Sequence, residues 1–454
     1  MIAPARRVAL DALSAASAGT DLPDVLARTR DQLADERDRA LAAAIVIGTL
    51  RWRARIDFHL QQAISRPLDK LDGIVLQILR LSVFQLLFLE RVPAAAVVDD
   101  AVSLVRRGGK TSAGGFVNGV LRTISRTRDR LLPAAPASVS TPEERSLAIH
   151  ALHVAGSHPP WLVARWVDRL GLDAATAWIA FNNVEAPLTL RVNRTRANRE
   201  AIAARLRELG VETEPTRIAP DGLTVTAGNP LKTPMSMSGD FLIQDEASQL
   251  VPLVVAVRPG HRVLDACAAP GGKSLALADA TGGTGLLVAA DARHRRLTLL
   301  RHVLDTHGVA GSLVAHDLTI GAPFLPVFDR VLVDAPCTGL GTLRRDVDIR
   351  WRRTEDDLGL AAARQRRMLA EASRAVAVGG RLVYATCSSE PEENEHVVAA
   401  FLHDRPTFRR VSAQTLIDDG VPAALLRADT GEMITRPDHH GLECFFAAAV
   451  ERVS

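Results

Sequence analysis

Cysteine is scarce in this sequence, which has four cysteines among its 454 residues. They lie far apart, without a C-x-x-C pair and without a histidine at the spacing of a metal ligand, so we expect no metal site. So few thiols also argue against a disulfide-stabilised secreted scaffold and agree with a reducing cytoplasm. The cysteines are Cys267, Cys337, Cys387 and Cys444.

A long apolar run without charges is also lacking. The most apolar segment, 71–89, contains two charged side chains and two glutamines, which predicts a buried helix of a bundle and not a membrane span. Near the N-terminus, Asp11 interrupts the apolar stretch that follows two arginines, so we do not expect a signal peptide. These absences predict a cytoplasmic protein without a membrane partner.

Neither sign of charge dominates, because the formal net charge is only +3. Arginine, however, far outnumbers lysine. The planar guanidinium fits phosphate oxygens and stacks on bases, so the excess favours a nucleic-acid partner. The alternative explanation is a GC-rich coding sequence, which raises the alanine and arginine content without any binding role.

The first 130 residues show helical periodicity throughout. Apolar residues recur every three or four positions, polar or Gly/Pro breaks separate the periodic stretches, and strand-like alternation is absent. We therefore expect a compact helical bundle over 1–130. Its clusters of basic residues are either solvated helix faces or phosphate contacts. The segment 97–124, with FVNGVLR at 116–122, resembles the C-terminal part of the NusB-like RNA-binding fold.

A stretch of small residues and prolines follows. Residues 131–144 lack helical periodicity, so we interpret them as a linker. Over 145–238 the signals are mixed: a helix at 158–171 begins at prolines and ends at a glycine, and short strands are expected at 188–192 and 223–225. This pattern predicts a small α+β module.

The pattern changes again over 239–454, where apolar, β-branched runs alternate with helical stretches such as 294–306 and 355–376. Strands that are buried on both faces and alternate with helices predict a doubly wound parallel sheet, an α/β Rossmann-like domain. Ligands of such sheets lie beyond the carboxyl ends of the strands. The predicted strands are 262–267, 286–291, 312–316, 329–334 and 381–386.

The first predicted strand runs into a glycine-rich loop, CAAPGGK. Glycines at a strand-to-helix turn let the backbone approach a ligand, and the N–H groups at the helix start favour anions. A Walker A loop needs glycine where Cys267 stands, and a G-x-G-x-x-G dinucleotide fingerprint is missing. The remaining interpretation is a cofactor derived from methionine, bound against the loop. The loop residues are Cys267, Ala268, Ala269, Pro270, Gly271, Gly272 and Lys273.

Aspartates end the strands that follow. Asp291 lies roughly 20 residues past the loop, where a ribose-binding carboxylate belongs in nucleotide-binding sheets. Asp317 and Asp334 follow the next two strands. A single strand-end aspartate is as often a helix cap. Three in series after a glycine-rich turn favour binding of the ribose and adenine of a cofactor.

Three motifs together resemble those of a known family. CAAPGGK at 267–273, VDAPCTGLGTLRR at 333–345 and VYATCS at 383–388, followed by PEENE at 391–395, are similar to the core motifs of the NOL1/NOP2/Sun RNA cytosine-C5 methyltransferases. With the NusB-like first region, the resemblance extends over nearly the whole chain. It points to the Sun/Fmu/RsmB branch, which methylates a cytosine in 16S ribosomal RNA.

The resemblance implies a class I methyltransferase domain over 239–454, S-adenosyl-L-methionine as cofactor and 16S ribosomal RNA as partner. It assigns cofactor contacts to the loop and to Asp291, Asp317 and Asp334. It also assigns the attack on the base to Cys387 and the release of the product to Cys337.

The two cysteines suit the chemistry that C5 methylation needs. C5 of cytosine is a poor nucleophile, and a thiolate that adds to C6 turns C5 into an enamine carbon. Cys337 follows the fourth predicted strand and Cys387 the fifth, and adjacent strands lie about 5 Å apart, so both thiols can reach one base. A lone strand-end cysteine is more often a small buried hydrophobe. Spacing does not decide which thiol attacks, because DNA cytosine methyltransferases use a Pro-Cys after the fourth strand.

Two further residues are expected to assist. An unperturbed thiol is mostly protonated near neutral pH, so we expect local activation of Cys387. Lys273 either contributes to this activation or pairs with a carboxylate. Asp334 is expected to hydrogen-bond the base and to protonate N3.

The stretch LRRDVDIRWRR at 343–353 packs five arginines around a tryptophan. Arginine binds phosphate and tryptophan offers a platform for a base, so we expect an RNA-facing surface. The alternative is the solvated start of a helix. Family members commonly carry His-Pro where this sequence has Asp346 and Val347. This departure bears on the shape of the loop and affects no expected catalytic residue. The target cytosine must be unpaired or flipped to reach two thiols. The expected RNA contacts are Arg344, Arg345, Arg350 and Trp351.

Two other functions stay open. One is the same chemistry on tRNA or another ribosomal site, and the other is a catalytically inactive NusB-like RNA-binding factor. The intact motifs argue against the second. We expect the protein to be a monomer.

Overall fold

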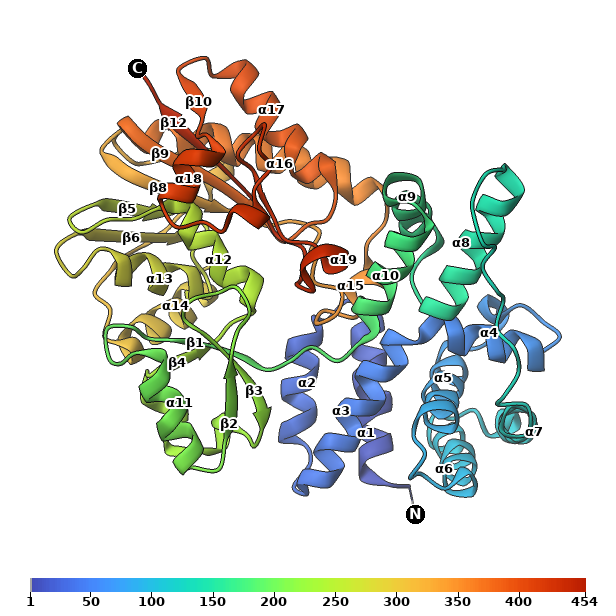
Figure 1. The fold of residues 1–454 in the computed structure, drawn as a ribbon. Helices are drawn as coiled ribbons and strands as arrows, with labels where there is room; N and C mark the ends of the chain where they lie inside the picture. Colours follow the sequence, from blue (N-terminus) through green and yellow to red (C-terminus); the bar gives the residue numbers. More distant parts are fainter. Residues whose placement is uncertain (1) are drawn as a thin grey trace. The chain divides into compact units, whose positions relative to one another are not determined.

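The computed structural model describes residues 2–454, which form two compact units. The helical unit contains the residues up to Val184 together with Leu343–Arg352. The sheet unit contains Glu185–Thr342 together with Arg353–Ser454. Helices build the first, and β-sheets covered by helices build the second (Figure 1).

Amphipathic helices build the helical unit, as the periodicity predicts. Its first helices are α1 (Pro4–Ser17), α2 (Leu22–Asp31), α3 (Glu36–Arg51), α4 (Arg53–Ala63), α5 (Gly73–Phe88), α6 (Ala94–Arg107) and α7 (Gly114–Arg126). The most apolar of them, α5, packs against α3, α4, α6 and α7. Ile78, Leu79 and Leu81 of α5 have no exposed surface, so this helix forms the centre of the bundle.

The interpretation of segment 71–89 as a buried bundle helix is confirmed. Its polar side chains have partners: Asp72 caps α5 by accepting a hydrogen bond from Ile74 N at 3.0 Å, and Gln85 accepts one from Arg6 Nε at 2.7 Å. Among the described residues, no helix combines the length and the hydropathy of a membrane span.

The units divide at a different place from the expected domains. The helices after the linker are α8 (Pro142–Gly156), α9 (Pro160–Leu170) and α10 (Leu172–Asn183), and their contacts place them in the helical unit. Helix α8 packs against α4, and Ala54 N donates to the Ser157 hydroxyl at 3.0 Å. Periodicity shows that a helix has an apolar face, but it does not show which neighbour covers that face.

The expected α+β module is confirmed as a small antiparallel sheet of order β2-β3-β1-β4 with one helix, α11 (Arg199–Glu208). Its strands are β1 (Thr189–Val192), β2 (Glu212–Pro215), β3 (Gly222–Ala227) and β4 (Phe241–Ile243). Ile202 and Leu206 of α11 pack against Leu190 and Leu223 of the sheet. The sequence analysis missed β2, which is a polar edge strand, and β4, which is very short.

The large sheet has the order β10-β12-β9-β8-β5-β6-β7, and β11 pairs with β12. Strands β5 to β9 are parallel, while β10 to β12 are antiparallel additions that the sequence did not predict. The strands are β5 (Arg262–Asp265), β6 (Leu286–Asp291), β7 (Ser312–Ala315), β8 (Phe328–Asp334), β9 (Val376–Thr386), β10 (Phe408–Arg410), β11 (Met433–Ile434) and β12 (Phe446–Arg452).

Helices cover both faces of this sheet, as expected for a doubly wound fold. Successive strand residues point to opposite sides: Val331 packs with α16 and α17, whereas Leu332 packs with α12 and α13. Helix α14 lies with α13. From residue 246 onward, the helices are α12 (Glu246–Val255), α13 (Gly272–Ala280), α14 (His294–His307), α16 (Asp356–Ala372), α17 (Glu395–Asp404), α18 (Ala413–Asp418) and α19 (Pro437–His440). Between α14 and α16, the short helix α15 (Ile349–Arg352) belongs to the helical unit.

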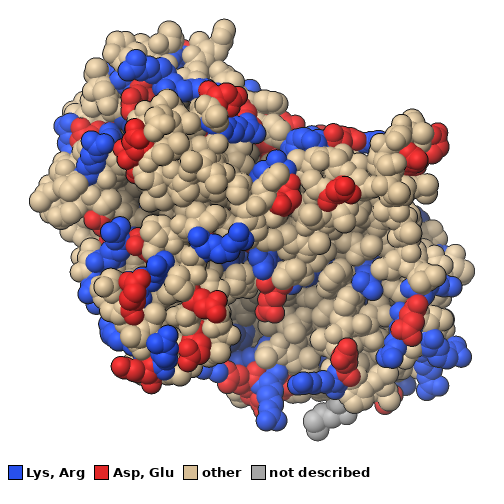
Figure 2. All heavy atoms as spheres, in the orientation of Figure 1, with Lys and Arg blue, Asp and Glu red and all other residues tan. Residues whose placement is uncertain are grey.

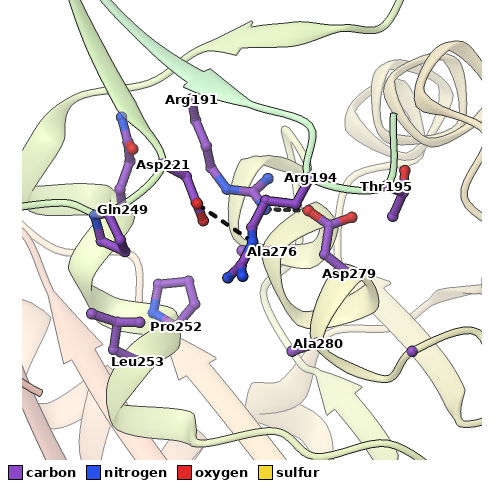
Figure 3. A pocket seen from close by; sticks show the side chains of 12 residues that line it. Arg191, Arg194, Thr195, Asp221, Gln249, Pro252, Leu253, Ala276, Asp279 and Ala280 are labelled. Carbon is purple, nitrogen blue, oxygen red and sulfur yellow. Dashed lines mark hydrogen bonds and ion pairs between the residues drawn. The ribbon is translucent and has the colours of Figure 1, made fainter. Parts of the chain in front are cut away.

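A buried ion pair joins the small sheet to a helix of the large one. Arg191 on β1 binds Asp279 on α13, and the two side chains are 5% and 8% exposed. They line a cavity of about 530 Å³, in which Arg194 also points toward Asp221 (Figure 3). Breaking a buried pair leaves one charge uncompensated, so this contact fixes where the small sheet sits within the sheet unit.

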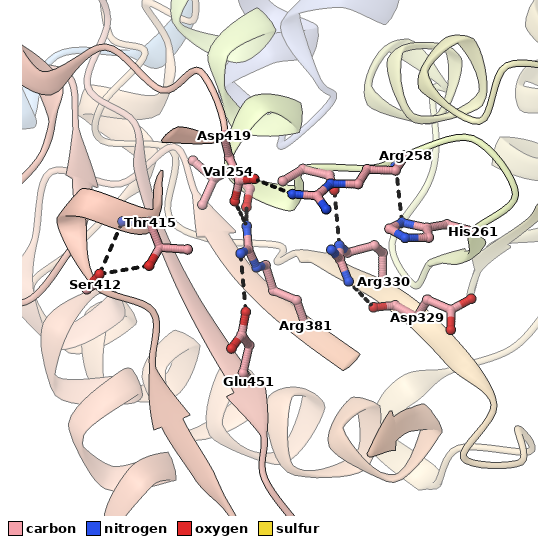
Figure 4. Close-up of polar contacts among 11 residues, drawn as sticks. Val254, Arg258, His261, Asp329, Arg330, Arg381, Ser412, Thr415, Asp419 and Glu451 are labelled. Atoms are coloured by element: carbon pink, nitrogen blue, oxygen red, sulfur yellow. Dashed lines mark hydrogen bonds and ion pairs between the residues drawn. The ribbon is translucent and has the colours of Figure 1, made fainter. Parts of the chain in front are cut away.

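An arginine network lies toward the amino-terminal ends of β8 and β9. Arg381 of β9 donates to Asp419 at 2.9 Å and contacts Glu451 of β12 at 3.2 Å (Figure 4). Arg258 donates to the other oxygen of Asp419 at 3.2 Å. Burial, and then the charge of Arg381, lower the pKa of Arg330 to about 10. Because these residues lie away from the carboxyl ends of the strands, we interpret the network as structural.

Candidate active site

The carboxyl ends of neighbouring parallel strands meet at one edge of the large sheet. Asp265 ends β5, Asp291 ends β6 and Asp334 ends β8, while Cys387 directly follows β9. Strand β5 lies between β6 and β8, and β9 lies beyond β8. The order of the strands therefore gathers four residues that are far apart in the sequence.

The glycine-rich loop leads from β5 into α13. Gly271 has a φ of +115°, and a Cβ atom at Gly272 would lie 3.1 Å from Gln244 Nε2. A side chain would strain the backbone at Gly271 and would press on Gln244 at Gly272. Gly272 also lines an open space beside the loop. That space is a cavity of about 150 Å³, and it reaches Lys273 and Asp334.

Asp265 lines this cavity, and the sequence analysis did not single it out. It is 1% exposed and accepts a hydrogen bond from Ser274 Oγ at 2.6 Å. Burial raises the pKa of Asp265 to about 7, although the Ser274 hydroxyl opposes this shift. The available signal was an acidic side chain inside the predicted strand 262–267, two residues before the loop.

Asp291 and Asp317 line a neighbouring cavity of about 120 Å³, which shares Cys267 with the first. Asp291 accepts hydrogen bonds from Ala269 N at 3.3 Å and from Arg293 N at 3.0 Å, so it also holds the loop. Asp317 caps a short 3₁₀ helix (Leu318–Ile320), and hydrogen bonds from the hydroxyl and backbone of Thr319 lower the pKa of Asp317. Asp317 is therefore a helix cap, which is one of the two roles expected for a strand-end aspartate, and it also lines the cavity.

The two thiols lie together, as the order of the strands predicts. The Sγ atoms of Cys337 and Cys387 are 3.3 Å apart. Their loops are joined by backbone hydrogen bonds, from Ala335 N to Ala385 O at 2.8 Å and from Gly341 N to Cys387 O at 2.9 Å. Both thiol groups therefore border the same small space.

Lys273 pairs with a carboxylate, which is one of the two alternatives that the sequence left open. Its Nζ donates to Asp334 Oδ2 at 2.7 Å. Burial alone would lower the pKa of Lys273, but the charge and the hydrogen bond of Asp334 outweigh it, so the pKa is raised. The pair therefore consists of an ammonium and a carboxylate next to the thiols.

The expected activation of Cys387 is wrong for this arrangement. The hydrogen bond with Cys337 raises the pKa of Cys387 well above its usual range, and burial adds to the shift. The charge of Lys273 acts in the opposite direction, but its effect is smaller. Sequence spacing could not reveal this, because the shift depends on the contact between the two sulfur atoms.

The other cysteines differ from this pair. Burial raises the pKa of Cys267, and Cys444 is 3% exposed in the interior of the sheet unit. Cys267 is half-buried and lines both cavities, whereas Cys444 is buried and behaves as a small hydrophobic group. In residues 2–454, no group of three or more His, Cys, Asp or Glu side chains is arranged to hold a metal ion.

Arg350, an expected RNA contact, lies in the interior of the helical unit. It has no exposed surface, and its guanidinium donates to Ser157 O at 3.1 Å and Leu343 O at 2.9 Å. Burial lowers the pKa of Arg350 to about 9. The expectation for Arg350 is therefore wrong: its donors satisfy backbone carbonyls where helices end. The composition of an arginine-rich segment does not show which of its arginines face solvent and which are buried against carbonyl groups.

The other three expected contacts, Arg344, Arg345 and Trp351, are half-buried in the same unit. Trp351 Nε1 donates to Leu50 O at 2.6 Å, and Arg344 lies over the ring of Phe181 at 4.5 Å. Basic and acidic side chains are interspersed over the face shown in Figure 2. Charge alone therefore does not mark an RNA surface on that face.

Family models match three parts of the chain. Residues 252–451 match a model described as 16S rRNA methyltransferase RsmB/F. Residues 3–126 match the NusB family, and residues 158–232 match the ferredoxin-like domain of RsmF/B-like methyltransferases.

Curated proteins are similar over nearly the whole length. The chain is 31% identical to the probable ribosomal RNA small subunit methyltransferase B of Bacillus subtilis, over 98% of each chain. It is 34% identical to ribosomal RNA small subunit methyltransferase B of Pseudomonas putida, over 91% of each.

Solved structures share the fold. The crystal structure of PH0851 covers 100% of this chain and 99% of its own at 24% identity and a TM-score of 0.81. A methyltransferase homologue from Pyrococcus horikoshii covers 69% of this chain and 100% of its own at 26% identity and a TM-score of 0.57.

Proposed function

Because the chain belongs to the RsmB/F family of 16S ribosomal RNA methyltransferases, we propose that it methylates C5 of a cytosine in 16S ribosomal RNA. The observation that carries this chemistry is the pair of thiols whose Sγ atoms lie 3.3 Å apart at the carboxyl edge of the sheet. Methylation at C5 requires covalent activation of the base. Methylation of a nitrogen or oxygen atom needs no thiol.

The residues at this edge fit S-adenosyl-L-methionine. The exposed backbone of the loop and the buried carboxyl of Asp265 suit the carboxylate and amine of the methionine part. Asp291 and Asp317, across Cys267, suit the hydroxyls of the ribose and the amine of the adenine. The cavity of about 150 Å³ that Gly272 helps to line agrees with a ligand beside the loop. When bound, this cofactor supplies an electrophilic methyl group.

Cys387 is assigned the attack on C6. A base that enters between the two thiols would replace the hydrogen bond that Cys337 makes to Cys387, which is the largest cause of the raised pKa of Cys387. The charge of Lys273 would then favour the thiolate. As electrons move toward N3, a proton passes from the Lys273 ammonium through Asp334 to N3, so that N3 gains the proton, Lys273 is left neutral and Asp334 ends as a carboxylate.

Cys337 is assigned the release step. After C5 has gained the methyl group, it still carries a proton. Removal of that proton restores the C5–C6 double bond and expels the Cys387 thiolate. Cys337 lies 3.3 Å from the attacking sulfur, so in its thiolate form it is the candidate to take this proton and become a thiol. Geometry alone would also permit the two cysteines to exchange roles, and the family resemblance favours this assignment.

Substituting each cysteine in turn tests the assignment. Cys387→Ser should abolish methyl transfer to RNA and leave the affinity for S-adenosyl-L-methionine, measured by calorimetry, nearly unchanged. Cys337→Ser should accumulate a protein–RNA adduct that resists denaturant. Wild-type turnover in Cys387→Ser would disprove the assignment. An RNA adduct that forms in Cys387→Ser but not in Cys337→Ser would show that Cys337 attacks the base and Cys387 releases the product.

The substrate needs a separate test, because the same chemistry on tRNA or another ribosomal site uses the same residues. Bisulfite sequencing of total RNA from cells with and without the gene should show one 5-methylcytosine lost from 16S ribosomal RNA. Loss from tRNA alone would support the alternative substrate. An inactive NusB-like factor would change no site, and its methyltransferase part should show no heat of cofactor binding.

A further inference from the structure

Glu393 lies between the two loops that carry the thiols, and nothing in the proposed chemistry uses it. It belongs to the PEENE segment after β9, at the end of a short 3₁₀ helix (Pro391–Glu393). Its side chain has no exposed surface. A buried carboxylate is costly unless hydrogen bonds compensate its charge, so its partners indicate what it does.

Both oxygens of Glu393 accept hydrogen bonds from the two thiol loops. Oε1 accepts from Thr338 N at 2.9 Å, and Oε2 accepts from the Thr338 hydroxyl and, at 2.5 Å, from the Ser388 hydroxyl. Thr338 is the residue after Cys337, and Ser388 is the residue after Cys387. One carboxylate therefore connects the neighbours of both cysteines.

Gln365 completes the set of donors from α16. Its Nε2 donates to Glu393 Oε1 at 2.9 Å and lies 3.2 Å from Pro336 O, just before Cys337. An ionised carboxylate only accepts hydrogen bonds, and its two oxygens suit several donors at once. Within residues 2–454, no cation forms an ion pair with Glu393, so hydrogen bonds carry the compensation.

The next residue extends the connection on the side of Cys387. Asn394 Nδ2 donates to Ser388 O at 2.9 Å, and its Oδ1 accepts from the Thr386 hydroxyl at 2.5 Å. Thr386 and Ser388 flank Cys387 directly. The Tyr384 hydroxyl donates to Glu393 O at 2.6 Å and so fixes the backbone of the segment to β9.

We propose that Glu393 is a positioning residue that keeps the thiols of Cys337 and Cys387 within reach of one base by binding Thr338 and Ser388 at the same time. This inference rests on the proposed function for its catalytic meaning, but the distance between the thiols can be measured without RNA or cofactor. Glu393 touches neither thiol, and it acts through the residues beside them.

Oxidation by diamide provides that measurement. Two neighbouring thiols each lose a hydrogen to the azo group, which becomes a hydrazine, and one S–S bond forms. The rate of the Cys337–Cys387 cross-link, followed by peptide mass spectrometry in the full chain, reports how often the two sulfur atoms meet. Glu393→Ala should lower this rate at least about tenfold, since the two loops lose their common partner.

Three further variants keep the test informative if Glu393→Ala does not fold. Glu393→Gln keeps the shape and one acceptor oxygen, so its rate should be intermediate. Ser388→Ala removes one donor and should also slow the cross-link. The matched control is Glu395→Gln, in the same segment, whose carboxylate pairs with Arg427 at 2.7 Å and should leave the rate unchanged. An unchanged rate in folded Glu393→Ala or Glu393→Gln would overturn the proposal.

Activity separates positioning from general support of the fold. Glu393→Gln should lower kcat for methyl transfer, leave KM for S-adenosyl-L-methionine unchanged, and melt within a few degrees of the wild type. A misplacement of about 1 Å costs roughly 100-fold in rate, which sets the expected loss for Glu393→Ala. A slower cross-link with full kcat would confirm the structural link and disprove its catalytic importance.

Discussion

Lys273 provides the cation of the candidate site. Its Nζ lies 2.7 Å from Asp334. The charge of Lys273 lowers the pKa of Cys387, whereas the contact with Cys337, burial and the charge of Asp334 raise it. Without this charge, the carboxylate of Asp334 would face the thiols uncompensated, and a second anion there would be less favourable.

Lys273→Met should therefore move the rise of the methyl-transfer rate with pH to higher pH and lower the rate at neutral pH by about 100-fold or more. Lys273→Arg keeps the charge and should keep the wild-type profile at a reduced rate. Single-turnover rates between about pH 6 and pH 9 measure this effect. A profile of unchanged shape in Lys273→Met would contradict it.

Asp265 makes the stability of the sheet unit depend on pH. Its pKa is about 7 in the folded protein against an ordinary value of 3.8, so the folded state holds the proton more tightly than the unfolded state. Stability from this group is therefore greatest in acid and is lost as the pH rises through 7. Above that pH the contribution stays constant.

Asp265→Asn cannot ionise and should lose less stability over the same range. The difference in Tm between the variant and the wild type should rise by on the order of 5 °C between about pH 5 and pH 8. Scanning calorimetry at several pH values measures it. A difference that does not change with pH would mean that Asp265 is ionised throughout.

At the scale of elements, the pairing of Arg191 with Asp279 joins β1 to α13. The surrounding cavity leaves Arg194 66% exposed, whereas Arg191 is 5% exposed. The two ion pairs therefore differ in what their loss costs. Loss of the Arg194 pair removes a contact that is already solvated. Loss of the Arg191 pair leaves one buried charge without its counter-charge.

Asp279→Asn should lower the free energy of unfolding of the sheet unit by about 3 kcal/mol, since it leaves Arg191 buried without its counter-charge. Arg194→Met should cost less than about 1 kcal/mol and serves as the matched control. Urea unfolding measures both. Equal effects would show that the buried pair has no special importance for the small sheet.

At the scale of the whole molecule, the segment Leu343–Arg352 belongs to the helical unit although the residues on both sides of it belong to the sheet unit. Arg350 explains its attachment. Besides Ser157 and Leu343, its guanidinium contacts Asn182 O at 3.3 Å and the Asn183 side chain at 3.0 Å. One side chain thus satisfies acceptors from distant parts of the helical unit.

Arg350→Met should destabilise the helical unit by about 3 kcal/mol, because several buried carbonyl groups lose their donor. Arg352→Met, two residues further, removes a partly exposed pair with Asp21 and Asp348 and should cost less than about 1 kcal/mol. Thermal unfolding followed by circular dichroism tests this. A small effect of Arg350→Met would show that these hydrogen bonds contribute little to the stability of the helical unit.

The fold class was predictable because its signals are local. Helical periodicity marked the bundle, and β-branched runs alternating with helices marked the parallel sheet, which the structure and the family matches confirm. The strands β10 and β11 escaped prediction because they are only three and two residues long. Strand β12 lies inside the sheet, between β10 and β9, and it escaped prediction because alanine, which is depleted in strands, makes up its centre. The packing of α8 against α4 escaped it too, because the sequence of a helix does not specify which neighbour covers its apolar face.

The sequence by itself determined which residues are available for the chemistry: two strand-end cysteines, the glycine-rich loop and the aspartates that follow it. Motif and strand order suffice for that, because parallel strands place their carboxyl ends on one edge. Only the tertiary structure decided how these residues affect one another. It brought the sulfur atoms within 3.3 Å, gave Lys273 to Asp334, buried Arg350 and surrounded Glu393 with donors from both thiol loops. These properties depend on distance and burial, which no spacing along the chain specifies.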